Sequence, residues 1–270
     1  ILRSATGSLF RVFETDGDDS YVETAVLVNE TPGENEMGDR QSVGDLDGDG
    51  AGEWISGDSD GDLIAFESVG DNAYRVIWTD RVDAGDIDGR LLSAAADLDG
   101  DGDEEFISGR LRRDPFDVES RRWTLTVFGA TADNEYSVEW QAQVVAGSSS
   151  GNGITITDLD GDGQLEWVVV LVPHLYVFEF DGAGGYEPVW YTQVRRTQRP
   201  AVGDLDSDGR QEIVFNRADG GLQTMRWRVP GVELLAPAGW TAVPSGPDRV
   251  QLGWEAVPGA LAYRIRRDDM

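Results

Sequence analysis

One nine-residue acidic motif occurs four times in this sequence, and each copy is followed by a short run of β-favouring residues. Every copy has Asp at positions 1, 3 and 5, Gly at position 6 and Glu at position 9. The copies are loop 1 (residues 45–53), loop 2 (97–105), loop 3 (158–166) and loop 4 (204–212). Repeats at this spacing indicate a chain built from several copies of one supersecondary unit.

A second pair of landmarks recurs in step with the acidic motif. Four Phe residues are each followed eight positions later by a Tyr, and turn-forming residues lie between them. In three copies a Trp follows four positions after the Tyr. This pattern predicts two strands joined by a tight turn, with the aromatic side chains at matched depth. The pairs are Phe13 with Tyr21, Phe66 with Tyr74, Phe128 with Tyr136, and Phe178 with Tyr186.

Together these landmarks define a unit of four antiparallel strands. Strand A enters the acidic loop, strand B leaves it, strand C carries the Phe and strand D carries the Tyr. Four-stranded units repeated at this spacing are typical of β-propeller blades, and no segment shows the 3.6-residue period of a helix. We therefore predict an all-β propeller fragment of four to five blades. Three are whole, residues 9–30 form a C–D hairpin without its A and B strands, and residues 201–228 form an A–B–C set.

The acidic loops have the composition of a calcium site. Alternating carboxylates in a curled loop converge on one point, and Ca²⁺ takes six to eight oxygen ligands. Mg²⁺ fits less well because it dehydrates reluctantly. An EF-hand is excluded, since position 12 holds Ser56, Ser108, Val169 and Phe215 instead of Glu, and the flanks are strands. The alternative is that the Asp-Gly pairs are simple hairpin turns, but carboxylates crowded in this way repel one another without a counter-ion.

We expect about four Ca²⁺ sites, one in each loop. The predicted ligands are the side chains at positions 1, 3, 5 and 9 and the backbone carbonyl at position 7. They are Asp45, Asp47, Asp49, Ala51 and Glu53; Asp97, Asp99, Asp101, Asp103 and Glu105; Asp158, Asp160, Asp162, Gln164 and Glu166; and Asp204, Asp206, Asp208, Arg210 and Glu212.

With its flanking strands, the Asp-x-Asp-x-Asp-Gly-x-x-Glu loop resembles the FG-GAP/VCBS repeats of integrin-α-like propellers. The resemblance covers residues ~9–230 and implies Ca²⁺ in each A–B loop and a parent ring that usually has seven blades. Two departures are visible. The ninth position is Glu where the family more often has Asp, and Ser207 replaces a Gly of the loop in the fourth copy.

The end of the chain resembles the first strands of a fibronectin type III domain. Alternation of Val250, Leu252 and Trp254 predicts one buried strand face, and Tyr263 follows a Pro-Gly turn. The expected organisation is a propeller at 1–230, incomplete at its N-terminal end, a linker at 231–236 and a partial fibronectin type III β-sandwich at 237–270.

The charge balance restricts the partners of the chain. The chain has 51 acidic residues and 22 basic residues, and every basic residue is Arg. The net charge is therefore −29. This argues against nucleic acid as a partner, and no apolar run is long enough for a membrane span. The chain has no Cys and one His, His174, which leaves little scope for thiolate or histidine chemistry.

One face of the predicted propeller carries its most variable loops. These are the B–C insertion at 110–122 and the D–A loops at 30–40, 81–90, 146–153 and 195–199, several of them rich in Arg. They could form a positive patch for a protein or glycan ligand, or their Arg could simply pair with nearby acids. The run from Asp58 to Asp62 also resembles a metal loop, but it falls at a B–C turn and is better interpreted as a hairpin turn.

The favoured function is a non-enzymatic, Ca²⁺-stabilised scaffold for binding or adhesion, in a secreted or cell-surface multidomain protein of a bacterium. The alternative is the propeller part of a polysaccharide-acting enzyme that resembles Ca²⁺-dependent rhamnogalacturonan lyases. A structural spacer is a third option. The lyase lacks an obvious base, because the chain has no Lys and a single isolated His.

Overall fold

The computed structural model describes residues 2–3, 7–38, 41–82, 87–112, 122–145, 151–194, 200–207, 210–216, 221–226, 241–246 and 249–253. The chain divides into two compact units, Ile1–Trp227 and Arg228–Met270. In the described part of both units, all regular secondary structure is β-strand. The predicted all-β class is therefore confirmed.

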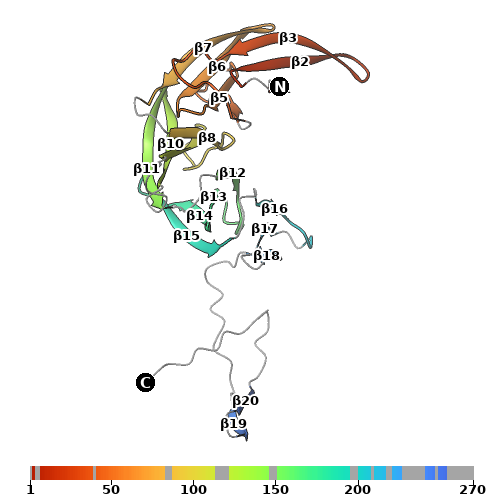
Figure 1. The fold of residues 1–270 in the computed structure, drawn as a ribbon, viewed down its shortest axis with the longest axis vertical. Coiled ribbons are helices and arrows are strands. Elements are labelled where there is room, and N and C mark those ends of the chain that lie inside the picture. Colours follow the sequence, from red (N-terminus) through yellow and green to blue (C-terminus); the bar gives the residue numbers. More distant parts are fainter. Residues whose placement is uncertain are drawn as a thin grey trace. The chain divides into compact units, whose positions relative to one another are not determined.

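The first unit contains five antiparallel sheets, which we number 1 to 5 in chain order (Figure 1). Sheet 1 is β1 (Leu2–Arg3), β2 (Leu9–Gly17) and β3 (Ser20–Val28); sheet 2 is β4 (Gln41–Gly44), β5 (Glu53–Gly57), β6 (Leu63–Gly70) and β7 (Ala73–Asp80); sheet 3 is β8 (Ile87–Leu92), β9 (Phe106–Arg112), β10 (Arg122–Ala132) and β11 (Glu135–Val145); sheet 4 is β12 (Gly151–Thr157), β13 (Glu166–Leu171), β14 (His174–Phe180) and β15 (Tyr186–Gln193); and sheet 5 is β16 (Ala201–Gly203), β17 (Glu212–Asn216) and β18 (Leu222–Arg226).

Sheets 2, 3 and 4 each pair four consecutive strands in chain order, which is the strand arrangement expected from the sequence. Two expectations need correction. Sheet 1 is not a bare hairpin, because β1 pairs with β2 as a third strand. The loops predicted at 81–90 and 146–153 also overlap strands, since β8 begins at Ile87 and β12 at Gly151. Neighbouring β9 and β13 offer hydrogen-bonding edges there, which outweighs the Gly content of both segments. The insertion predicted at 110–122 overlaps strands at both ends, since β9 runs to Arg112 and β10 begins at Arg122.

The turns between the third and fourth strands explain why the Phe–Tyr spacing recurs. In sheets 1 to 3 the turn has two residues, and its second residue, Asp19, Asn72 or Asn134, has a φ of 54–61°. Asn and Asp tolerate this left-handed conformation better than most side chains. A register shift also occurs immediately before the repeated Phe in sheets 1 to 4. In all four sheets the Tyr pairs with the residue two positions after the Phe, so it is offset along its strand instead of lying directly opposite.

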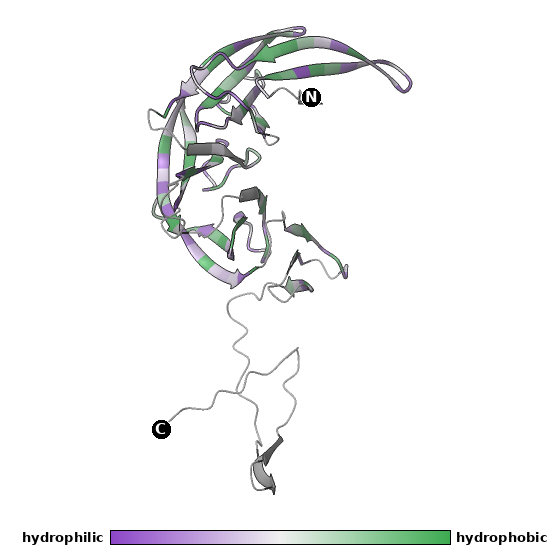
Figure 2. Cartoon of the chain, in the orientation of Figure 1, coloured by the Kyte–Doolittle hydropathy of each residue, from purple (hydrophilic) through white to green (hydrophobic). Residues whose placement is uncertain are grey.

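The hydrophobic cores lie between successive sheets, and aromatic rings form their centres. Trp78 of sheet 2 packs edge-on against Phe106, Phe128 and Tyr136 of sheet 3. Trp140 makes the same contacts one sheet later. The repeated Trp is thus a contact between sheets. Outer strands such as β11 alternate hydrophilic and hydrophobic residues (Figure 2), as expected for a strand with one solvated face.

The described part of the second unit is one antiparallel hairpin, β19 (Thr241–Gly246) with β20 (Arg249–Gly253). The segments that carry Trp254 and Tyr263 lie outside the described residues. The fibronectin type III domain at 237–270 therefore remains a prediction.

Candidate metal centres

Each acidic loop connects the first two strands of its sheet and is held in shape by its own carboxylates. In loop 3 the position-1 carboxylate of Asp158 accepts hydrogen bonds from the N–H groups of Gly161 (2.6 Å) and Gly163 (3.1 Å). The position-5 carboxylate accepts one from the N–H at position 7, over 2.6 Å in loop 1, 2.9 Å in loop 2 and 2.8 Å in loop 3. These local bonds curl the backbone so that alternate side chains point inward.

The backbone at position 4 has the same conformation in all four loops. Gly48, Gly100 and Gly161 have φ of 73°, 81° and 80°, and Ser207 of loop 4 has a φ of 60°. The Ser substitution noted in the sequence therefore keeps the left-handed turn, although a residue with a Cβ is strained there. The next residues of loop 4, Asp208 and Gly209, lie outside the described residues.

The ninth-position Glu is buried beneath each loop. Glu53, Glu105, Glu166 and Glu212 are 1–3% exposed. In every copy one carboxylate oxygen accepts a hydrogen bond from the N–H at position 2 of the same loop, over 2.7 Å in loops 1 and 2 and 2.9 Å in loop 4. The sequence predicts this Glu as a metal ligand, whereas the structure uses one of its two oxygens to fix the loop. In each loop one of the two carboxylate oxygens therefore already accepts a hydrogen bond from the backbone.

That second oxygen has no hydrogen-bond partner among the described residues in two of the loops. Glu53 Oε1 and Glu166 Oε1 are both fully buried. Asp45, Asp47 and Glu53 offer oxygens within 4.8 Å of one another, as do Asp158, Asp160 and Glu166. In loop 2 the corresponding group is Asp97, Asp99 and Asp101. Carboxylates this close fit a hard cation, and a buried oxygen without a donor is costly unless something binds it.

The electrostatics of the loops point the same way. The pKa of Glu53 is raised to about 7, chiefly by burial. The hydrogen bond from the N–H of Leu46 lowers this pKa, and the charges of Asp47 and Asp49 raise it. Burial likewise raises the pKa of Glu105 and of Glu166 to about 8. A bound cation would reduce this penalty, because it supplies a charge opposite to that of the carboxylates.

The structure adds acids that the sequence interpretation missed. Carboxylate oxygens of Glu67, Asp49 and Asp133 lie within 4.8 Å of one another. The pKa of Glu179 is raised first by burial and then by the charges of Asp160 and Asp162. Both Glu directly follow the repeated Phe, so this position was a usable signal.

Sheet 3 has Gly129 at the position after its Phe, where sheets 2 and 4 have a Glu. The carboxylate there comes instead from Glu139 on the neighbouring strand β11. A Cβ added at Gly129 would lie 2.0 Å from Glu139 Oε1, so the Glu139 carboxylate fills this space. Burial, followed by the charges of Asp99, Asp101 and Asp103, raises the pKa of Glu139. Each of loops 1 to 3 therefore has at least one acid from outside its own motif nearby.

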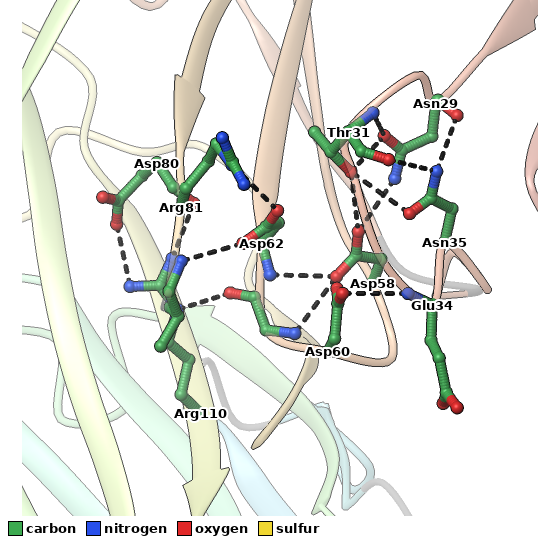
Figure 3. Close-up of polar contacts among 12 residues, drawn as sticks. Asn29, Thr31, Glu34, Asn35, Asp58, Asp60, Asp62, Asp80, Arg81 and Arg110 are labelled. Carbon is green, nitrogen blue, oxygen red and sulfur yellow. Dashed lines mark hydrogen bonds and ion pairs between the residues drawn. The ribbon is translucent and has the colours of Figure 1, made fainter. Parts of the chain in front are cut away.

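The run from Asp58 to Asp62 forms the turn between β5 and β6, as the sequence interpretation favoured, and its side chains take part in a hydrogen-bond network (Figure 3). Asp58, Asp60 and Asp62 also offer oxygens within 4.8 Å of one another, as the acids of the loops do. Asp58 Oδ2 accepts hydrogen bonds from Asn29 Nδ2 (2.9 Å) and Thr31 Oγ1 (3.4 Å). Asp58 Oδ1 accepts them from the N–H groups of Gly61 (3.1 Å) and Asp62 (2.9 Å). Asp58 therefore ties the β3–β4 connection to this turn.

The described Arg residues beside this turn are paired with acids. Arg110 lies 2.8 Å from an Asp80 carboxylate oxygen, and Arg81 lies 3.6 Å from one of Asp62. This agrees with the simpler of the two interpretations of the Arg-rich loops. Residues 113–121 and 195–199, which carry most of the predicted positive patch, lie outside the described residues.

Asp58 gives the network a pH dependence. Burial and the hydrogen bond with Asp60 raise its pKa from 3.8 to about 7. Between these values the folded state holds a proton that the unfolded state has lost, so stability falls as pH rises. We expect Asp58→Asn to reduce the loss of unfolding free energy between pH 5 and pH 8 by about 2–3 kcal/mol. Urea denaturation at both pH values measures it.

The control for this variant is Asp18→Asn, at an exposed turn residue of sheet 1. It should leave the pH dependence of unfolding as in the wild type. If Asp58→Asn unfolds with the same pH dependence as Asp18→Asn, the assigned role of Asp58 is wrong.

No protein-family model matches this sequence, and the curated proteins compared with it give no match. In the part of the chain that the structure describes, no helix has the length and apolar character of a membrane span. The sites must therefore be interpreted from their own geometry.

Proposed function

We propose that the first unit is a Ca²⁺-stabilised β-propeller fragment, with sheets 1 to 5 as its blades, and that it acts as a non-enzymatic binding scaffold. The observation that carries this proposal is the pair of unpartnered buried oxygens, Glu53 Oε1 and Glu166 Oε1, each beside two further Asp carboxylates. Two separate loops with the same arrangement point to one recurrent ligand of opposite charge.

The donor set favours Ca²⁺ over other metals. All side-chain donors are carboxylate oxygens, which suit hard cations, and the chain has no Cys and one His for softer metals. Ca²⁺ accepts irregular coordination by many protein oxygens, whereas Mg²⁺ needs near-ideal octahedral geometry and keeps its waters.

A scaffold role follows from what the cations would stabilise. The loops connect strands inside three or more sheets, so bound ions would rigidify the framework that presents the loops of the opposite face. Sites of extracellular grade have a Kd of ~10⁻⁴–10⁻³ M and would be filled outside cells. We therefore propose a secreted or cell-surface location and a protein or glycan partner at the B–C and D–A loops.

Terbium luminescence tests the cation assignment. Tb³⁺ prefers the same oxygen ligands as Ca²⁺ and emits when excited through a nearby indole. Trp54 and Trp167 directly follow the buried Glu of loops 1 and 3 and are themselves 5% and 0% exposed. We expect sensitised emission that millimolar Ca²⁺ abolishes and equal Mg²⁺ reduces little. Emission no stronger than that of free Tb³⁺, or equal competition by Mg²⁺, would contradict the assignment.

A further inference from the structure

Two buried tyrosine hydroxyls lie at the junctions between sheets without a hydrogen-bond partner. Tyr136 of sheet 3 and Tyr186 of sheet 4 are 7% and 5% exposed. Neither hydroxyl has a partner among the described residues. A buried hydroxyl without a partner costs free energy, so Phe would be the better residue if packing were the only role.

Tyr136 packs beside loop 1, which belongs to the preceding sheet. The ring packs in the core shared by sheets 2 and 3, together with Leu46 of loop 1. Burial, and then the carboxylates of Glu53, Asp47 and Asp49, raise the pKa of Tyr136 above its ordinary value. A tyrosine hydroxyl carries its proton at neutral pH, so this buried group is a potential hydrogen-bond donor.

The turn that precedes Tyr136 also contacts loop 1. The N–H of Asn134 donates a hydrogen bond to Asp47 Oδ2 over 2.6 Å, and its side-chain amide donates to Glu67 Oε1 over 3.4 Å. Asp133 of the same turn lies within 4.8 Å of Asp49. The third sheet therefore contacts the candidate cation site of the second sheet through both the turn and the Tyr.

The same placement recurs one sheet later with different residues. Burial, and then the carboxylates of Glu105, Asp99 and Glu139, raise the pKa of Tyr186 above its ordinary value. Tyr186 also contacts Trp140 of sheet 3 at 5.6 Å between ring centroids. Tyr186 packs in the core that contains Leu98 of loop 2, as Tyr136 packs with Leu46 of loop 1.

We propose that the hydroxyls of Tyr136 and Tyr186 are positioning groups of the cation sites in loops 1 and 2. Cation binding would then also stabilise the packing of the following sheet against the sheet that carries the loop. This inference rests on the proposed function. Neither hydroxyl donates a hydrogen bond to a described residue in the structure, and we expect each to donate to a ligating carboxylate when the cation is bound. Because the donor comes from the next sheet, occupancy of the loop and docking of the two sheets stabilise each other.

The test compares the double variant Tyr136→Phe/Tyr186→Phe with the control Tyr74→Phe. Tyr74 occupies the same position of the repeat in sheet 2 and packs against the core shared with sheet 1, where the described residues contain no acidic loop. Ca²⁺ affinity is measured by calorimetry, and the near-ultraviolet difference spectrum on Ca²⁺ addition reports the tyrosines. Melting in EDTA shows whether each variant folds.

We expect the double variant to bind Ca²⁺ roughly tenfold more weakly at two sites, as loss of a hydrogen bond to a charged group predicts. Its tyrosine difference spectrum should be lost, while its melting in EDTA stays unchanged or rises. The control should bind as the wild type does. Wild-type affinity in the double variant would overturn the inference and leave the proposed function intact. A wild type that binds no Ca²⁺ would overturn both.

Discussion

Chelation of Ca²⁺ with EDTA lowers the free energy of unfolding of this chain by roughly 1.6–5.6 kcal/mol, if four sites of extracellular grade are filled at one to ten times their Kd. The physical reason is linkage, since an ion that binds only the folded state stabilises it by mass action. The structure adds an electrostatic reason, because burial and then the charges of neighbouring Asp carboxylates raise the pKa of Glu53, Glu105 and Glu166. Calorimetric melting in EDTA and in millimolar Ca²⁺ measures the difference.

Mg²⁺ at the same concentration is the control for this experiment. It screens charge as Ca²⁺ does but should restore little of the lost stability, because the loops demand several protein oxygens around one ion. Melting curves that coincide in EDTA and in Ca²⁺ would show that the loops are turns without a metal function.

Replacement of Glu166 by Gln should raise the free energy of unfolding without Ca²⁺ and reduce the stabilisation that Ca²⁺ provides. The Gln side-chain oxygen can still accept the hydrogen bond from the N–H of Leu159, so the loop keeps its anchor. Without Ca²⁺ the variant loses a buried carboxylate whose pKa burial raises to about 8, and it should be more stable by about 1–3 kcal/mol at pH 7.5. With Ca²⁺ it loses one ligand oxygen and gains less stability than the wild type does.

The matched control is Glu187→Gln on β15, where the side chain is exposed. It should change stability little under either condition. A Glu166→Gln variant that is destabilised equally in EDTA and in Ca²⁺ would mean that this carboxylate only holds the loop.

Much of the fold could be predicted because the same landmarks recur. The acidic loop marks the first two strands and the Phe–Tyr spacing marks the last two, so sheets 2, 3 and 4 have the expected strand order. The starts of β8 and β12 could not be predicted in the same way. Gly89 and Gly151 suggest loops locally, and only pairing with the neighbouring strand makes these segments β-structure.

The candidate sites show a similar division between local and long-range information. The loop carboxylates follow from spacing alone, but the anchoring bond from the N–H of Leu46 to Glu53 depends on burial beneath the loop. Glu139 could not be assigned from its own position, because it fills the space beside Gly129 on a neighbouring strand. The sequence predicts a hairpin turn at Asp58, but the burial of Asp58 depends on residues distant in sequence, such as Asn29, which donates a hydrogen bond to it.

Calorimetric titration with Ca²⁺ tests the central claim most directly, with the wild type compared to the double variant Glu53→Gln/Glu166→Gln. These two Glu carry the unpartnered buried oxygens. We predict saturable binding to the wild type with a Kd of ~10⁻⁴–10⁻³ M, and two fewer sites in the variant. Absence of saturable binding to the wild type, or an identical titration of the variant, would contradict the assignment of the acidic loops as calcium sites.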